Sequence, residues 1–133
     1  MRSELEALAA ALAAKHAAPE EVRVLQEMVD EDRARTGDPI ALSQANKRFH
    51  RQIHLASHNR YLVQQLDLVH RSMALLATTS LAAEGRGKTA LAEHQAIVDA
   101  IREGDEAGAA AALRAHISKA FETRLKLDAQ GGH

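Results

Sequence analysis

The spacing of apolar residues along the chain predicts helices and no sheet. In each long segment, apolar positions recur three and four residues apart, which places them on one face of an α-helix. Only two prolines and seven glycines are available to interrupt these segments. We therefore expect an all-α, antiparallel bundle of about six helices. The predicted helices cover residues 2–15, 19–35, 39–57, 60–78, 89–103 and 105–127.

Residues with strong preferences for helix ends mark the boundaries between these helices. Pro39 suits a first helical turn, where proline has no hydrogen bond to lose, and Gly104 suits a C-terminal cap. Residues 79–88 contain Gly85 and Gly87 and are expected to form one long loop. The residues expected to cap the N-termini of the helices that follow them are Asp38, Asn59 and Asp105.

The helix over 60–78 has a wide apolar surface, which is typical of a helix that is covered on two sides. Its apolar positions are Leu62, Leu66, Val69, Met73 and Leu76, with Tyr61, Leu68 and Leu75 beside them. One small bundle does not cover so wide a surface completely, so we expect a homodimer with Leu68 and Leu75 as its contacts. The first helix carries one apolar side, made of Leu5, Leu8, Ala9 and Leu12. The last helix begins rich in alanine and ends with Ile117, Phe121 and Leu125 among its apolar residues.

Composition excludes several classes of protein. The hydrophobic fraction is 46% with only 2% aromatic residues, and the alanines and leucines that supply most of it favour helix. The formal net charge is −1, so this segment lacks the basic excess of a nucleic-acid-binding surface. Because there is no cysteine, disulfides and thiolate metal sites are excluded. No apolar run approaches the roughly 20 residues of a membrane span, and we expect a cytoplasmic protein.

Polar residues on three predicted helices are expected to meet inside the bundle. A helical wheel, which advances ~100° per residue, places His94 at the centre of the apolar face of its helix. It places His116 on the flank of the apolar face of the last helix. Asn46 and His50 are four residues apart, so they adjoin on one side of their helix. The interior is therefore expected to contain several imidazoles and an amide.

Two interpretations of this cluster follow from the residues themselves. Buried imidazoles cost free energy unless each has a partner, and hydrogen bonding within the core is the commoner solution for a single histidine. A divalent metal can satisfy three histidines at once through neutral imidazole nitrogens. Spacing does not decide between these two interpretations.

Other polar residues near the cluster are expected to have different environments. His54 and His58 follow His50 at intervals of four residues on the same helix. Each interval turns the side chain about 40° further from the apolar face, so we expect both in solvent. His70 flanks the apolar face of its helix, from which it can reach either the pocket or a subunit interface. Arg71 is a candidate ligand for an anion, with a surface salt bridge as the alternative.

Three segments resemble, in this order, parts of the FCD ligand-binding domain: RSELEALAAALAA, NKRFHRQIHLASHNRYL and EHQAIVDAIREGDEAGAAAALRAHI. Together they span nearly the whole chain. The FCD domain is the C-terminal effector domain of GntR-type bacterial transcription regulators of the FadR subfamily. Resemblance to it implies a helical bundle that dimerises and binds a small organic acid. His70 and Arg71 are then candidate contacts for this effector.

The resemblance also implies a metal site. Many FCD domains hold a divalent metal on one Asp and three His, and the matching positions are Asn46, His50, His94 and His116. Asn46 stands where Asp is commoner, so its amide oxygen can coordinate a cation but brings no negative charge. Zinc or nickel is the expected ion, and a small carboxylate is the expected effector.

The resemblance further implies a domain organisation. We expect residues 1–128 to form an FCD-like ligand-binding and dimerisation domain and residues 129–133 to form a disordered tail. Family members carry an N-terminal winged-helix DNA-binding domain that is absent from this sequence, so DNA contacts are expected only through such an attached domain.

The expected function is effector sensing without catalysis. The alternatives are a helical mononuclear metalloenzyme and a purely structural dimerisation bundle. An enzyme of this kind needs a general base close to the metal. Glu93 adjoins His94 in the sequence, but consecutive residues of a helix point in different directions, so no convincing base is evident.

Overall fold

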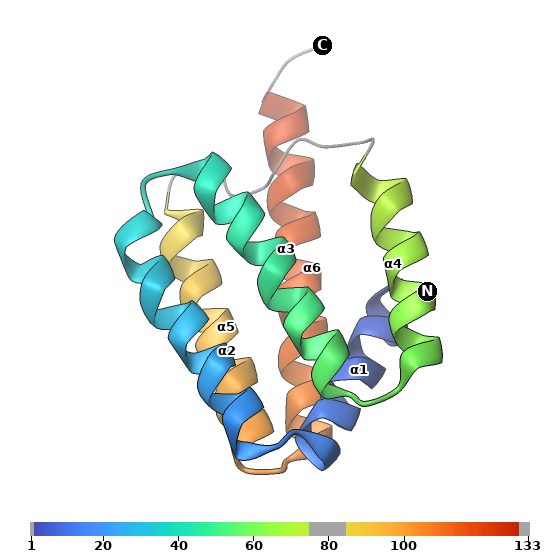
Figure 1. Ribbon diagram of the computed structural model, residues 1–133. Coiled ribbons are helices and arrows are strands. Elements are labelled where there is room, and N and C mark those ends of the chain that lie inside the picture. Colours follow the sequence, from blue (N-terminus) through green and yellow to red (C-terminus); the bar gives the residue numbers. More distant parts are fainter. Residues whose placement is uncertain (1, 75–84, 131–133) are drawn as a thin grey trace.

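The computed structural model describes residues 2–74 and 85–130, which form α-helices, one short 3-10 helix and no strand. The expected all-α antiparallel bundle is confirmed (Figure 1). Its elements are α1 (Arg2–His16), α2 (Pro19–Asp32), η1 (Arg33–Arg35), α3 (Pro39–Ala56), α4 (Arg60–Ala74), α5 (Arg86–Arg102) and α6 (Glu106–Gln130). None of the helices in these residues is both long and apolar enough to cross a lipid bilayer.

Helix α1 packs against α3, α4, α5 and α6, so it lies at the centre of the bundle. Its buried face is made mainly of small residues, which let the neighbouring helices approach its backbone closely: Glu6, Ala7, Ala9, Ala10 and Ala13. The prediction that Leu8 belongs to the buried face is wrong, because this side chain is 48% exposed. Leu5 and Leu12 are partly buried and pack beside a small cluster of Ala9, Leu62 and Leu66, through which α4 attaches to α1.

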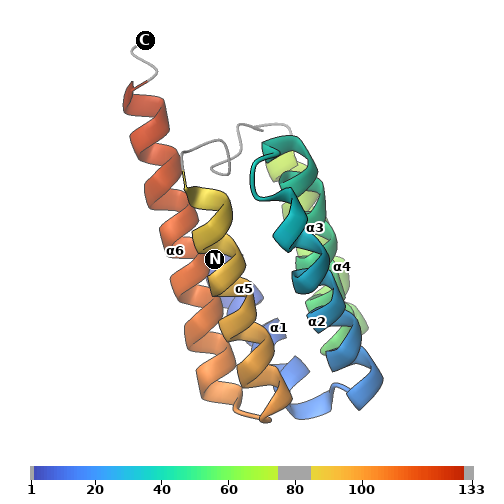
Figure 2. The same ribbon diagram turned by 90° about the vertical axis from the view of Figure 1, so that its left-hand side faces the viewer.

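The main core lies between α1, α2, α3, α5 and α6. Its largest fully buried side chains include those of Leu25, Phe49, Ile53, Ile97 and Leu113. Helix α5 lies beside α2 on one side and beside α6 on the other (Figures 1 and 2). The core therefore fixes α3, α5 and α6 relative to one another, and each of these three helices carries one of the interior histidines.

The predicted helix caps are confirmed. The side-chain Oδ1 atoms of Asp38, Asn59 and Asp105 each accept a hydrogen bond from the amide three residues later, at 3.1, 3.1 and 2.9 Å. Gly104 has a φ angle of 70°, a left-handed conformation that glycine adopts without a steric cost. It separates α5 from α6 and lets the chain reverse direction within a few residues.

Helix α5 begins at Arg86, earlier than the predicted start at residue 89. Gly87 is therefore a helical residue and not part of a loop. A Cβ atom at this position would lie 2.6 Å from the carbonyl oxygen of Thr36, so glycine is needed for α5 to pack against the segment before α3. The rest of the predicted loop and the expected contact Leu75 fall within residues 75–84, outside the described part of the chain.

Helix α6 continues to Gln130, past its predicted end at residue 127, while residues 131–133 lie outside the described part of the chain. The C-terminal end of α6 extends beyond the other helices (Figure 1). Phe121 and Leu125, apolar residues in the C-terminal half of α6, are 62% and 52% exposed. The interior of one chain therefore ends near His116.

Candidate metal centre

Three imidazoles from three helices meet in the interior of the bundle. His50 comes from α3, His94 from α5 and His116 from α6, and all three side chains are buried. The Nε2 atom of His116 lies 3.3 Å from the Nε2 atom of His50 and 3.3 Å from that of His94. One nitrogen from each ring lies within 4.8 Å of the others, so the three can bind one cation together.

The ring of His94 is held in place by an aromatic contact. It stacks on Phe49 with the ring centroids 4.3 Å apart and the planes 19° from parallel. Phe49 is fully buried and directly precedes His50 on α3. One large core residue thus supports His94 and also anchors the turn of α3 that carries His50, which preorganises both rings.

Two carboxylates contact the outer nitrogens of these rings. The Nδ1 atom of His50 lies 3.1 Å from Oε2 of Glu6, and Nδ1 of His116 lies 2.6 Å from Oε1 of Glu93. An ionised carboxylate only accepts hydrogen bonds, so each ring donates from Nδ1. In a neutral imidazole this leaves Nε2 with a lone pair that points to the meeting point of the three rings.

With both Nδ1 atoms directed at carboxylates, the Nε2 atoms of His50 and His116 face each other at 3.3 Å. Burial lowers the pKa of His50 to about 4 and outweighs the opposing effect of Glu6. Burial also lowers the pKa of His94 well below its ordinary value. Both rings are thus neutral near pH 7, and each can bind a cation through a nitrogen lone pair.

The spacing of the nitrogens suits a divalent metal. Two nitrogen ligands about 2.1 Å from a tetrahedral zinc ion lie roughly 3.4 Å apart. The contacts of 3.3 Å that His116 makes with His50 and His94 are close to this value. The donor set, its burial and its spacing therefore fit zinc or a similar ion.

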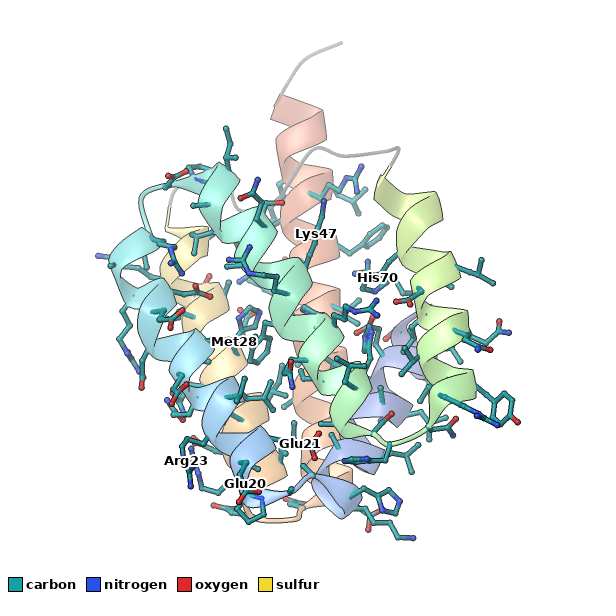
Figure 3. The ribbon with its side chains drawn as sticks, viewed as in Figure 1. Glu20, Glu21, Arg23, Met28, Lys47 and His70 are labelled. Carbon is teal, nitrogen blue, oxygen red and sulfur yellow. The ribbon has the colours of Figure 1, made fainter. Side chains whose placement is uncertain are left out.

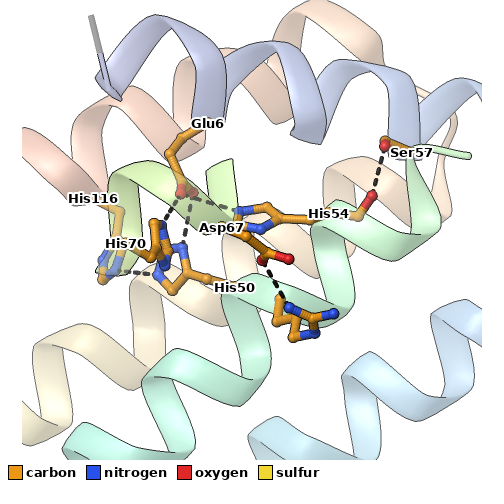
Figure 4. A network of polar contacts seen from close by, with 8 residues as sticks. Glu6, His50, His54, Ser57, Asp67, His70 and His116 are labelled. Atoms are coloured by element: carbon orange, nitrogen blue, oxygen red, sulfur yellow. Dashed lines mark hydrogen bonds and ion pairs between the residues drawn. The ribbon is translucent and has the colours of Figure 1, made fainter. Parts of the chain in front are cut away.

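Glu6 is a member of this site that the sequence analysis missed. It is fully buried on α1, and its carboxylate receives hydrogen bonds from His50, His54 and His70 (Figure 4). Burial would raise the pKa of Glu6, but these three hydrogen bonds together outweigh it and hold the pKa well below its ordinary value. The carboxylate is therefore ionised even though no water reaches it.

The prediction that His54 lies in solvent is wrong, because this residue is only 1% exposed. Its Nε2 atom donates to Oε1 of Glu6 at 3.0 Å. The wheel measures only the angle from the apolar face of α3, whereas α1 and α4 cover the side on which His54 lies. His58 is exposed as predicted and contacts Glu21 through Nε2 at 2.7 Å.

A second carboxylate, Glu93, joins His116 to a buried arginine. Both Nη atoms of Arg86 donate to Glu93, at 2.7 and 2.8 Å, and Arg86 is only 3% exposed. Burial would raise the pKa of Glu93, but His116 and Arg86 outweigh it, so this pKa is lowered. Glu93, for which the sequence analysis found no role at the site, reaches it through this contact with His116 on α6.

Comparison with known proteins agrees with the resemblance seen in the sequence. The FCD domain family matches residues 1–119. The chain belongs to the FCD domain family. Two curated relatives of this FCD domain, from Escherichia coli and Shigella flexneri, are each named a putative L-lactate dehydrogenase operon regulatory protein. Each is 35% identical over 95 residues, which cover 68% of this chain and 37% of the relative.

A solved structure, E. coli McbR/YncC, has the same fold, with a TM-score of 0.77 and 18% sequence identity. The match covers 99% of this FCD domain and 62% of that chain. The FCD domain described here thus spans only part of the length of its relatives.

The remaining predicted site residues lie around the three imidazoles. Asn46 is partly buried on α3, one turn before His50. His70 is half-buried and points from α4 toward the interior (Figure 3), where its Nε2 atom lies 2.6 Å from Oε1 of Glu6. The side chain of Arg71 lies outside the described part of the FCD domain.

Proposed function

We propose that this FCD domain is the effector-sensing and dimerisation domain of a GntR-type transcription regulator of the FadR subfamily. It binds a small organic acid at a divalent metal and thereby modulates DNA binding by an attached winged-helix domain. The observation that carries the proposal is the meeting of three buried imidazole nitrogens from three helices, of which those of His50 and His116 face each other at 3.3 Å. The regulatory proteins among its relatives support the same role.

His50, His94 and His116 hold the metal, and the amide oxygen of Asn46 is the fourth ligand. Imidazole nitrogen suits zinc and nickel, which makes these the favoured ions. A bound dication supplies a positive charge that attracts a carboxylate group. Arg71 is proposed as a further effector contact, whereas His70 acts on the site through its hydrogen bond to Glu6.

The domain responds to its effector as a dimer. The C-terminal half of α6 exposes Phe121 and Leu125, and α4 exposes Leu68, which is 57% exposed. Exposed large apolar residues favour contact with a second copy of the chain. An effector that binds one arrangement of the dimer more tightly than another shifts the spacing of the attached DNA-binding domains.

Effector binding that depends on the metal tests this function. We expect zinc-loaded protein to bind a small carboxylate such as L-lactate, because the relatives are named as regulators of an L-lactate dehydrogenase operon. Chelator-stripped protein should bind it at least ten times more weakly. Calorimetric titrations of L-lactate and of a matched amide into both forms measure the difference. Equal binding of the acid with and without zinc, or hydrolysis or other turnover of the acid, would contradict the proposal.

A further inference from the structure

The proposed metal ligands lack negative charge. The three histidines would bind a metal through neutral imidazole nitrogens. Asn46 carries an amide where the family more often has a carboxylate. Neutral ligands do not balance the positive charge of a dication. In a buried site of low dielectric constant, such an unbalanced charge has a high electrostatic free energy. The compensation must therefore come from residues outside the ligand set.

Two carboxylates lie next to the ligands, and their charges are balanced differently. Glu93 forms a two-armed ion pair with Arg86, which offsets its negative charge. Among the described residues, the hydrogen-bond partners of Glu6 are three imidazoles, with no lysine or arginine among them. Glu6 is thus the buried carboxylate whose charge is available to the metal centre.

The hydrogen bonds to Glu6 hold this charge in one place. Oε2 contacts the ligand His50 at 3.1 Å, while Oε1 accepts from His54 at 3.0 Å and from His70 at 2.6 Å. Contacts of these lengths are typical of charge-assisted hydrogen bonds. His54 and His70 therefore hold the carboxylate in one orientation.

We propose that Glu6 is a positioning residue that supplies, through His50, the negative charge that Asn46 does not bring to the metal centre. The inference rests on the proposed metal-binding function. The carboxylate keeps the proton of His50 on Nδ1 and makes Nε2 a stronger donor to a cation. In the family, the negative charge more often belongs to a carboxylate that binds the metal directly. Here it belongs to Glu6, which contacts the ligand His50 and not the metal.

Zinc affinity of charge variants tests this inference. We expect Glu6→Gln to weaken zinc binding about 10–100-fold, the usual effect of losing an outer partner of a metal ligand. Adding Asn46→Asp to Glu6→Gln should restore most of the affinity, because the charge returns to the site. Glu4→Gln, the same change at an exposed position of α1, should leave affinity unchanged. Competition with a chromophoric chelator measures each value, and circular dichroism confirms that each variant is folded.

The ligand set should remain the same when Glu6 is changed. Cobalt(II) bound to wild type and to Glu6→Gln is expected to give the same visible absorption bands, reached at a higher cobalt concentration in the variant. A purely structural role of Glu6 would change the bands or the fold and would not be rescued by Asn46→Asp. If Glu6→Gln does not fold, His70→Gln, at a half-exposed position, is expected to weaken zinc binding in the same direction.

Several results would overturn the inference. The first is a Glu6→Gln variant that binds zinc as tightly as the wild type. The second is a loss of affinity in Glu6→Gln that the added Asn46→Asp does not restore. The third applies if Glu6→Gln does not fold, and is a His70→Gln variant that binds zinc as tightly as the wild type. Binding of two zinc ions that falls to one in His70→Gln would also overturn it, because Glu6 would then be a direct ligand. If the wild type binds no zinc, the proposed function itself fails, which is a different outcome.

Discussion

The Nε2 atoms of His50 and His116 face each other at 3.3 Å, although both rings direct their Nδ1 atoms at carboxylates. Such a contact between two ring nitrogens inside a protein calls for a proton or a cation between them. Burial opposes the proton by lowering the pKa of His50 to about 4. A cation between the two rings is therefore favoured over a proton on His50.

The metal-free protein should lose stability as the pH falls below neutrality. The pKa of His50 is about 4 in the folded state, against about 6.5 in the unfolded chain, so only the unfolded chain takes up this proton between these values. The loss begins near pH 6.5 and levels off near pH 4, with a size on the order of 3 kcal/mol. The lowered pKa of His94 adds to it in the same direction.

Urea unfolding of chelator-stripped protein at pH 7, 6 and 5 measures this dependence. His50→Gln removes the titrating ring and should flatten the curve. Glu6, whose pKa is lowered, contributes stability above its unfolded value of about 4.5 and loses it only at lower pH. Stability that is constant, or that rises, between pH 7 and pH 5 would show that these histidines are not buried as neutral rings.

Gly87→Ala should destabilise the bundle by about 1–3 kcal/mol, the usual cost of forcing an extra methyl group into a packed interior. The new Cβ would lie 2.6 Å from the carbonyl oxygen of Thr36 and 2.9 Å from a methyl group of Leu42, so α5 must move. Gly37→Ala is the matched control, because no atom lies within 4 Å of its new methyl group. Equal free energies of unfolding for the two variants would contradict the observed packing of α5.

Replacing Phe121 and Leu125 together with serine should turn a dimer into a monomer. Both side chains are more than half exposed in one chain, so the monomer fold should survive. Loss of a well-packed apolar contact costs more than about 1 kcal/mol, and two such losses weaken dimerisation at least tenfold. Light scattering measures the mass, and Val24→Ser on α2 serves as the control. An unchanged dimer would place the interface elsewhere.

The helices and their caps could be predicted from the sequence because they depend on residues close in the chain. Asp38 and Gly104 act on amides and carbonyls within a few positions, and His94 lies on a face that its own helix defines. These local signals were sufficient to predict that the bundle is helical and that His94 lies in its interior.

Glu6, His54 and Gly87 could not be placed correctly because their environments come from other helices. The leucines of α1 suggested one buried face, but the alanines allow closer packing and place Glu6 inside. His54 is covered by elements distant in sequence, and Gly87 is needed only because the backbone of Thr36 lies against it. A wheel centred on the alanines of α1 would have located Glu6 on the buried face.

Zinc titration of chelator-stripped protein tests the central claim most directly. The wild type should bind one zinc ion per chain at pH 7 and more weakly as the pH falls through the range of histidine, about 6.5. His94→Ala should lose this binding and some stability, since it removes a ligand and leaves a cavity beside Phe49. His58→Gln, at an exposed position, should bind as the wild type does. Equal zinc affinity in all three proteins, or none in the wild type, would show that the three imidazoles are core residues and hold no metal.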